Sequence, residues 1–379
     1  MSVSHRLFTS LACVVLPLAL TSAPAAADPV QIAAAGDIVS ARAISAPGFF
    51  YANVWTITYR STGATGQSNV VSGTVIVPKG GSANKPIVGY APGTHGLGDQ
   101  CAPSVHLAAG DEFEGLLIHQ YATRGFAVAV TDYEGLGTPG DHTYTAGRAE
   151  GNAVLDIVRA AQRLPGSGLS PSAPVAIVGY SQGGHAAGWA AQLAPTYAPE
   201  LNYKAFSVGA PPANLRVVAD HNDGGPNVGL VLAAGIGLDA AYPDLSLDPF
   251  LNDAGRAGFA DIRDDCTDDF SKFAGRRLAD FTTTDVLNRP EWTARVNEQN
   301  LGGQRPARVP VLLYHSALDE ILPVQVSDAL RSSWCRAGAN LTYWRLLIPG
   351  HAPTAATASP AVTSWVADRL AGQPAGGNC

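Results

Sequence analysis

The chain has 379 residues with a formal net charge of −7, and 46% of its residues are hydrophobic while 15% are charged. This composition is typical of one large globular domain, or of one domain with an insertion, and it excludes a mainly disordered chain. The cationic residues form no cluster larger than Arg276-Arg277. The sequence therefore offers no basic surface for a phosphate backbone, and nucleic-acid binding is not expected.

The N-terminus has the pattern of a secretory signal peptide. Residues 1–6 are positively charged, residues 7–20 form an apolar run, and residues 25–27 are three alanines that suit a cleavage site. The apolar run contains Pro17 and is shorter than the roughly 20 residues of a membrane span. We expect residues 1–27 to be a signal peptide, the mature protein to be secreted, and no transmembrane segment.

Short apolar and β-branched runs then alternate with helical patterns along the chain. Strands are expected near residues 54–59, 70–77, 86–91, 127–132, 174–179, 205–208, 310–314 and 342–347, and helices near 112–123, 149–164, 182–193, 327–337 and 360–370. Such alternation is typical of parallel strands joined by crossover helices. The expected fold class is α/β, with a mostly parallel sheet flanked by helices.

This alternation stops between residues 211 and 308. The nearly uncharged run at 227–241 fits a plain buried helix and a substrate-contacting cap equally well, and the two interpretations are compatible. We expect an α/β core formed by residues 28–210 and 309–379, with a helical cap or lid insertion at 211–308. In an α/β sheet, such an insertion would lie over the carboxyl ends of the strands, where ligands bind.

The strongest motif is Gly179-Tyr180-Ser181-Gln182-Gly183, which lies between an expected strand and an expected helix. In this context G-x-S-x-G forms a sharp turn that presents its serine hydroxyl above the sheet. The N-terminus of the following helix favours the negative charge that develops when the serine attacks a carbonyl. Ser181 is therefore the expected nucleophile.

A serine hydroxyl needs a general base, and in folds with this motif a histidine near the C-terminus supplies it. His351 is the expected base because it follows the last expected strand in Pro349-Gly350-His351. The alternatives are His185, His221 and His315. His185 lies one helical turn after Ser181, so we expect it to pack against the sheet.

The base needs an acid that fixes its tautomer and stabilises the imidazolium. Asp319 is the expected acid because it follows the strand near 310–314 and precedes the expected base. Glu320 is its neighbour and competitor. Asp132 precedes the nucleophile, so we expect it to brace a loop.

An acyl-transfer site also needs two hydrogen-bond donors for the tetrahedral oxyanion. The main-chain N–H of Gln182, directly after the nucleophile, is expected to be one. The second is expected from Gly93-Thr94-His95-Gly96, with Thr94 as the first choice and His95 as the second. The alternative for this stretch is a simple flexible turn.

Four cysteines remain after the expected signal peptide: Cys101, Cys266, Cys335 and Cys379. An exported chain can pair them, and four cysteines allow three connectivities. Their spacing matches no zinc site, and the acidic run at 261–269 lacks the spacing of a calcium loop. We expect no metal and no cofactor, and we interpret the acidic run as a solvated surface.

Several stretches together resemble the secretory lipase family of α/β-hydrolases, the lipase A-like enzymes of fungi and actinobacteria. These stretches are GTHGLGDQCAPS (93–104), TDYEGLG (131–137), GYSQGGHAA (179–187), HSALDEILP (315–323), PGH (349–351) and the helical insertion. The resemblance covers most of the chain and implies an α/β-hydrolase fold with a helical lid and a triad at Ser181, Asp319 and His351. It also implies disulfides that pair Cys101 with Cys266 and Cys335 with Cys379, and the glycine-rich GTHG stretch favours a main-chain oxyanion donor.

The expected function is that of a secreted serine carboxylic ester hydrolase, a triacylglycerol lipase or carboxylesterase, that acts through an acyl-enzyme intermediate. The apolar insertion suits a hydrophobic ester as substrate, at a lipid–water interface. We expect a monomer. The alternatives are an acyltransferase or peptidase that uses the same triad, and a non-catalytic binding protein on a hydrolase scaffold.

Overall fold

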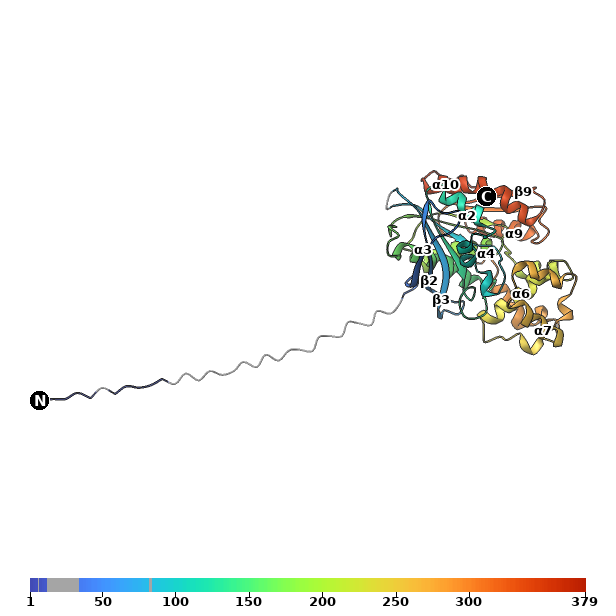
Figure 1. Ribbon diagram of the computed structural model, residues 1–379. Helices are drawn as coiled ribbons and strands as arrows, with labels where there is room; N and C mark the ends of the chain where they lie inside the picture. Colours follow the sequence, from blue (N-terminus) through green and yellow to red (C-terminus); the bar gives the residue numbers. More distant parts are fainter. Residues whose placement is uncertain (6, 12–33, 82–83) are drawn as a thin grey trace. The chain divides into compact units, whose positions relative to one another are not determined.

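The computed structural model describes residues 1–5, 7–11, 34–81 and 84–379 (Figure 1). The chain divides into two compact units, Met1–Ile32 and Ala33–Cys379. In the first unit, residues 1–5 and 7–11 form neither helix nor strand. The expected cleavage site after residue 27, and most of the expected signal peptide, lie outside the described residues. Within the described ranges, no helix combines the length and apolarity that a membrane span requires.

The described strands of the second unit form one nine-stranded sheet in the order β1-β2-β3-β5-β4-β6-β7-β8-β9. Their bounds are β1 Ile38–Ile44, β2 Ala52–Thr62, β3 Ser68–Pro78, β4 Ile87–Ala91, β5 Ala127–Tyr133, β6 Pro174–Tyr180, β7 Asn202–Gly209, β8 Val311–Ser316 and β9 Leu341–Leu346. The pairs from β1 to β3 and the β3–β5 pair are antiparallel, and every pair from β5 across to β9 is parallel. The expected mostly parallel sheet is confirmed.

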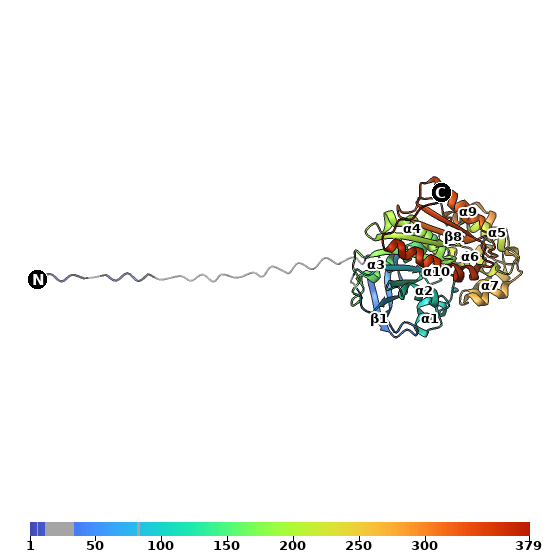
Figure 2. The same ribbon diagram turned by 90° about the horizontal axis from the view of Figure 1, so that it is seen from above.

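Helices cover both faces of this sheet, which explains why its central strands are almost continuously apolar. Successive residues alternate between two hydrophobic cores: Val75 and Leu313 belong to one, and Ile76 and Leu312 to the other. The first core contains α3 (Gly147–Arg163), α4 (Gln182–Tyr197) and α9 (Gln325–Arg336), and the second contains α1 (Pro103–Ala109), α2 (Gly115–Ala122) and α10 (His351–Leu370). Figure 2 shows α2 and α10 next to each other over the sheet.

An inserted helical segment, residues 210–310, connects β7 to β8. Its helices are α5 (Leu215–Asn222), α6 (Val228–Ala241), α7 (Asp253–Ile262) and α8 (Pro290–Glu298), with short 3₁₀ turns between them. Leu232, Ile236, Phe259, Phe281 and Trp292 contribute to a separate hydrophobic core there. In Figure 1, α6 and α7 lie beside the part of the second unit that carries the sheet.

Three elements differ from the expectations. The edge strand β1 is not expected because its side chains are mostly exposed and give no apolar alternation. The seven-residue α1 is too short to show a helical period. α10 begins at His351 rather than near residue 360, because Pro360 lies inside this helix instead of at its first turn.

Candidate active site

Four of the expected site residues follow strands that run parallel within the sheet. Thr94 follows β4, Ser181 follows β6, Asp319 follows β8 and His351 follows β9. From β4 to β9 the strand order is β4-β6-β7-β8-β9, so β7 is the one strand in this row that is not followed by one of the four residues. The inserted helical segment starts directly after β7. Because the carboxyl ends of parallel strands share one edge of a sheet, all four residues and the start of the insertion lie at that edge.

Ser181 occupies the sharp turn between β6 and α4. Its φ of 61° and ψ of −123° are a strained conformation for a residue with a side chain. The turn needs glycine on both sides: a Cβ at Gly179 would collide with the carbonyl oxygen of Gly183, and one at Gly183 with that of Ala91. The Ser181 N–H donates to the Gly209 carbonyl at 3.0 Å, which fixes the turn against β7.

Asp319 and His351 form a direct hydrogen-bonded pair. The His351 Nδ1 lies 2.6 Å from Asp319 Oδ2, and the main-chain N–H groups of Ile321 and Leu322 donate to Oδ1 at 3.0 and 2.8 Å. Burial alone would raise the pKa of Asp319, but the hydrogen bonds from His315 and His351 outweigh it and hold this pKa well below its usual range. Asp319 is therefore an ionised partner for His351 at neutral pH.

Glu320 and His315, the alternatives considered for the acid and the base, both form hydrogen bonds with this pair. Glu320 Oε2 accepts the main-chain N–H of His351 at 2.8 Å, so this carboxylate binds the backbone and not the ring. His315 is fully buried and lies 3.1 Å from Asp319 Oδ2, on the same oxygen that binds His351. Its other ring nitrogen, Nδ1, lies 2.8 Å from Ser327 Oγ. With both nitrogens bound, His315 has none left to serve as a general base.

The other two alternatives for the base, His185 and His221, form hydrogen bonds with groups other than Asp319 and His351. His185 is fully buried, with Nδ1 2.8 Å from Glu150 Oε2 and Nε2 2.8 Å from the Gln299 carbonyl. His221 Nε2 lies 3.1 Å from the main-chain carbonyl of Glu320. Sequence reasoning missed Glu150, which lies in the first turn of α3 among other polar and charged residues and belongs to no motif.

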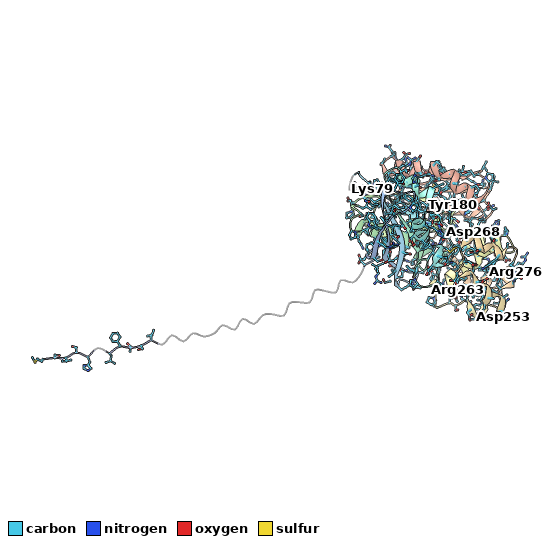
Figure 3. All side chains as sticks on the ribbon, in the orientation of Figure 1. Lys79, Tyr180, Asp253, Arg263, Asp268 and Arg276 are labelled. Carbon is cyan, nitrogen blue, oxygen red and sulfur yellow. A yellow bond between two sulfur atoms is a disulfide. The ribbon has the colours of Figure 1, made fainter. Side chains whose placement is uncertain are left out.

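Tyr180, which is labelled in Figure 3, directly precedes Ser181 and contacts His351. Its hydroxyl donates to the His351 carbonyl at 2.8 Å, and the centroids of the two rings lie 4.9 Å apart. Within residues 84–379, which are described without a gap, Ser181 Oγ and the His351 ring share no hydrogen bond. Catalytic hydrogen bonds often tighten only when substrate binds.

The two expected oxyanion donors lie on anchored segments. Gln182 is the first residue of α4, where main-chain N–H groups lack a partner within the helix, and its side chain donates to Glu150 Oε1 at 3.0 Å. Thr94 Oγ1 lies 2.9 Å from the Tyr144 hydroxyl, and the Thr94 carbonyl accepts the Thr267 hydroxyl at 2.9 Å. Either hydroxyl can be the donor in the Thr94–Tyr144 contact, so Thr94 has two candidate donors for an oxyanion, its main-chain N–H and its hydroxyl.

The second choice, His95, instead holds the loop in place. Its Nδ1 lies 2.9 Å from the Gly93 carbonyl and its Nε2 2.9 Å from Glu112 Oε1. The Gly93 N–H donates to the buried Glu114 carboxyl at 3.2 Å, and burial raises the pKa of Glu114 to about 7. Sequence reasoning missed both glutamates, because neither follows a strand or belongs to a motif.

Two disulfides join the pairs that the family resemblance implies. Cys101 pairs with Cys266, and Cys335 pairs with Cys379. The first connects the loop after β4 to the inserted helical segment, where the Leu97 N–H also donates to the Asp265 carbonyl at 2.9 Å. The loop that carries Thr94 is thus tied covalently to the insertion.

A cavity of about 570 Å³ lies against the turn between β6 and α4, with Ser181 and Gln182 in its wall. The inserted helical segment supplies much of the remaining wall through apolar side chains that include Leu215, Leu230, Leu238, Phe259, Phe281 and Trp292. The insertion's charged residues Asp253, Arg263 and Arg276 are solvent-accessible (Figure 3). In the described ranges, His, Cys, Asp and Glu form no group of three or more that could hold a metal ion.

The α6 helix contributes to both the buried core and the cavity wall. Ile236 is buried in the core of the insertion, Leu230, Val231 and Ala234 line the cavity, and the buried Leu232 also forms part of the cavity wall. The run at 227–241 is therefore both a largely buried helix and a part of the cavity wall.

A family model described as secretory lipase matches residues 106–378. The chain belongs to the secretory lipase family. The chain is 32% identical over 335 residues to a Mycobacterium tuberculosis protein named as a probable inactive lipase, covering 83% of this chain and 73% of the relative. It is also 32% identical over 323 residues to the secreted triacylglycerol lipase LIP5 of Malassezia furfur, covering 79% of this chain and 82% of the relative.

Among solved structures, this chain is similar to Candida antarctica lipase A. The TM-score is 0.83 at 26% sequence identity, covering 90% of this chain and 83% of the other. The α/β-hydrolase fold implied by the sequence motifs is thereby confirmed.

Proposed function

We propose that this member of the secretory lipase family is a secreted serine carboxylic ester hydrolase that cleaves triacylglycerols and related lipid esters. The observation that carries the proposal is the Asp319–His351 hydrogen bond of 2.6 Å, at the sheet edge where Ser181 borders an apolar cavity. An ionised acid that orients a histidine beside a strained serine turn supports nucleophilic catalysis.

The reaction follows from the roles of these groups. Ser181 Oγ attacks the ester carbonyl carbon while His351 Nε2 takes its proton, and Asp319 stabilises the resulting imidazolium. The main-chain N–H groups of Gln182 and Thr94 bind the oxyanion. His351 then returns the proton to the departing alcohol, which leaves an acyl-Ser181 ester. Water, activated by His351, attacks that ester and releases the fatty acid with the free serine.

The apolar cavity supports a hydrophobic acyl group as the part of the substrate that binds there. In this proposal, residues 211–308 act as the cap over a core of residues 28–210 and 309–379. Residues 1–27 act as the signal peptide, which agrees with the word secreted in the name of the Malassezia relative.

A second candidate is a non-catalytic protein that binds lipid esters or fatty acids. One observation favours it: the 32% identical mycobacterial relative is named as inactive. The intact set of Ser181, Asp319 and His351 in this chain supports catalysis instead.

A chain-length profile tests the proposal. The purified protein is assayed with p-nitrophenyl esters from acetate to palmitate and with emulsified triacylglycerol, and a p-nitroanilide serves as the amide control. We expect turnover of the esters, faster for longer acyl chains than for acetate, and little turnover of the anilide. Binding of fatty acid without any ester turnover would support the second candidate, and preferred cleavage of the anilide would indicate a peptidase.

A further inference from the structure

The carboxylate of Asp319 binds two histidines and not one. His351 Nδ1 and His315 Nε2 both lie against Oδ2, at 2.6 and 3.1 Å, while two main-chain N–H groups donate to Oδ1. A carboxylate accepts about four hydrogen bonds. All of these sites on Asp319 are therefore filled by protein donors, and His315 is the donor that shares its oxygen with the catalytic histidine.

The contacts of His315 define the tautomer of its ring. Nε2 faces two groups that only accept, Asp319 Oδ2 and the Leu322 carbonyl at 3.0 Å, so Nε2 carries a proton. Nδ1 faces Ser327 Oγ at 2.8 Å, and this hydroxyl can donate to the ring. His315 and Ser327 are each 0% exposed, so solvent water does not replace either contact. The His315 ring thus connects the Ser327 hydroxyl to the Asp319 carboxylate.

We propose that His315 is a positioning residue for ester hydrolysis, which holds Asp319 Oδ2 in the orientation that His351 needs. The proposal rests on the proposed function, because it concerns the same acid. Residues 84–379 are fully described, and in that range His315 is not part of the cavity wall. Loss of its N–H therefore lowers kcat, through a looser His351, and leaves KM unchanged. Misplacement of a catalytic group by about 1 Å can cost about 100-fold.

Two amide variants of His315 test the contributions of its two ring nitrogens separately. In His315→Gln, the side-chain Nε2 is the same number of bonds from Cα as the histidine Nε2, so its N–H can still reach Asp319. In His315→Asn, the amide reaches only as far as the histidine Nδ1, so it can meet Ser327 but not Asp319. Both variants remove the ring, and they differ in whether the donor to Asp319 remains.

The experiment measures kcat and KM for a p-nitrophenyl ester, together with the melting temperature, for wild type, both variants and Ser327→Ala. We expect His315→Asn to lose about 10- to 100-fold in kcat at unchanged KM. We expect His315→Gln and Ser327→Ala to retain kcat to within a few-fold. Wild-type kcat in a folded His315→Asn protein would overturn the proposal. A loss of about tenfold or more in kcat in a folded His315→Gln protein would also overturn it, whether or not the Asn variant folds.

Ser181→Ala separates this proposal from the proposed function. If Ser181→Ala retains ester turnover, the proposed function fails whatever the variants at His315 show. If Ser181→Ala is inactive while His315→Asn behaves as wild type, the positioning role alone fails.

Discussion

The hydroxyl of Tyr180 donates a 2.8 Å hydrogen bond to the main-chain carbonyl of His351, and the two rings pack with their centroids 4.9 Å apart. Tyr180 is the last residue of β6 and directly precedes Ser181, whereas His351 is the first residue of α10. These two residues are 171 positions apart in the chain. The strand that ends directly before Ser181 thus also holds the helix that begins with His351.

Tyr180→Phe removes the hydroxyl but keeps the ring against His351. One hydrogen bond is typically worth about 1 kcal/mol, so we expect a small drop in melting temperature and up to about a tenfold loss in kcat, with KM unchanged. Steady-state kinetics and thermal unfolding check this. Unchanged kcat and unchanged melting temperature together would show that the hydroxyl contact does not position His351.

Thr94 and Tyr144 should act as one unit. Their hydroxyls lie 2.9 Å apart, and the main-chain N–H of Thr94 is the proposed oxyanion donor. We expect Thr94→Val and Tyr144→Phe each to lower kcat by about tenfold, and the double variant to lose little more, because contacting residues are non-additive. A loss of about 100- to 1,000-fold in Thr94→Val with normal kcat in Tyr144→Phe would instead assign the donor to the Thr94 hydroxyl.

The Glu114 carboxyl should make stability depend on pH. Burial raises its pKa from 4.5 to about 7, so the folded state binds more protons than the unfolded state between these values. The free energy of unfolding should then fall as pH rises from about 4.5 through 7, by up to about 1.4 kcal/mol per pH unit.

Glu114→Gln tests this dependence, since an amide keeps an acceptor for the Gly93 N–H but does not titrate. Denaturant unfolding between pH 5 and 8 should give a flatter profile for this variant. Part of the slope below pH 6 should persist, because burial also raises the pKa of Asp132 to about 6. Asp253→Asn, at a fully exposed side chain, serves as the control. Equal slopes for wild type and Glu114→Gln would contradict this account.

The Cys101–Cys266 disulfide should matter for activity as well as for stability. It ties the loop that carries Thr94 to the inserted helical segment, across a sequence separation of 165 residues. Replacing both cysteines with serine should cost about 2 to 4 kcal/mol in stability and lower kcat at temperatures where the protein stays folded. Replacing Cys335 and Cys379, which lie 44 residues apart, is the matched control and should lower stability without changing kcat. Equal kcat in both double variants would contradict a role for the first disulfide at the site.

The sequence predicted the parts of this protein that depend on local pattern. The sheet strands follow from apolar runs, and the acid and base candidates follow from their places after strands. The supporting contacts were not predictable in this way. His315–Asp319, Glu150–His185 and Glu114–Gly93 bring together side chains or backbone groups from different elements or across a turn, and no periodicity encodes such contacts. The exposed β1 and the short α1 were missed because neither has a strong apolar pattern.

The central claim is that Ser181 is the nucleophile of an ester hydrolase, and covalent labelling tests it most directly. The protein is treated with a fluorophosphonate, and the modified peptide is identified by mass spectrometry beside an assay of p-nitrophenyl ester turnover. We predict one adduct, on the peptide that contains Ser181, with loss of turnover in step with labelling, and neither adduct nor turnover in a folded Ser181→Ala protein. An adduct on another residue, or ester turnover by Ser181→Ala, would contradict the account.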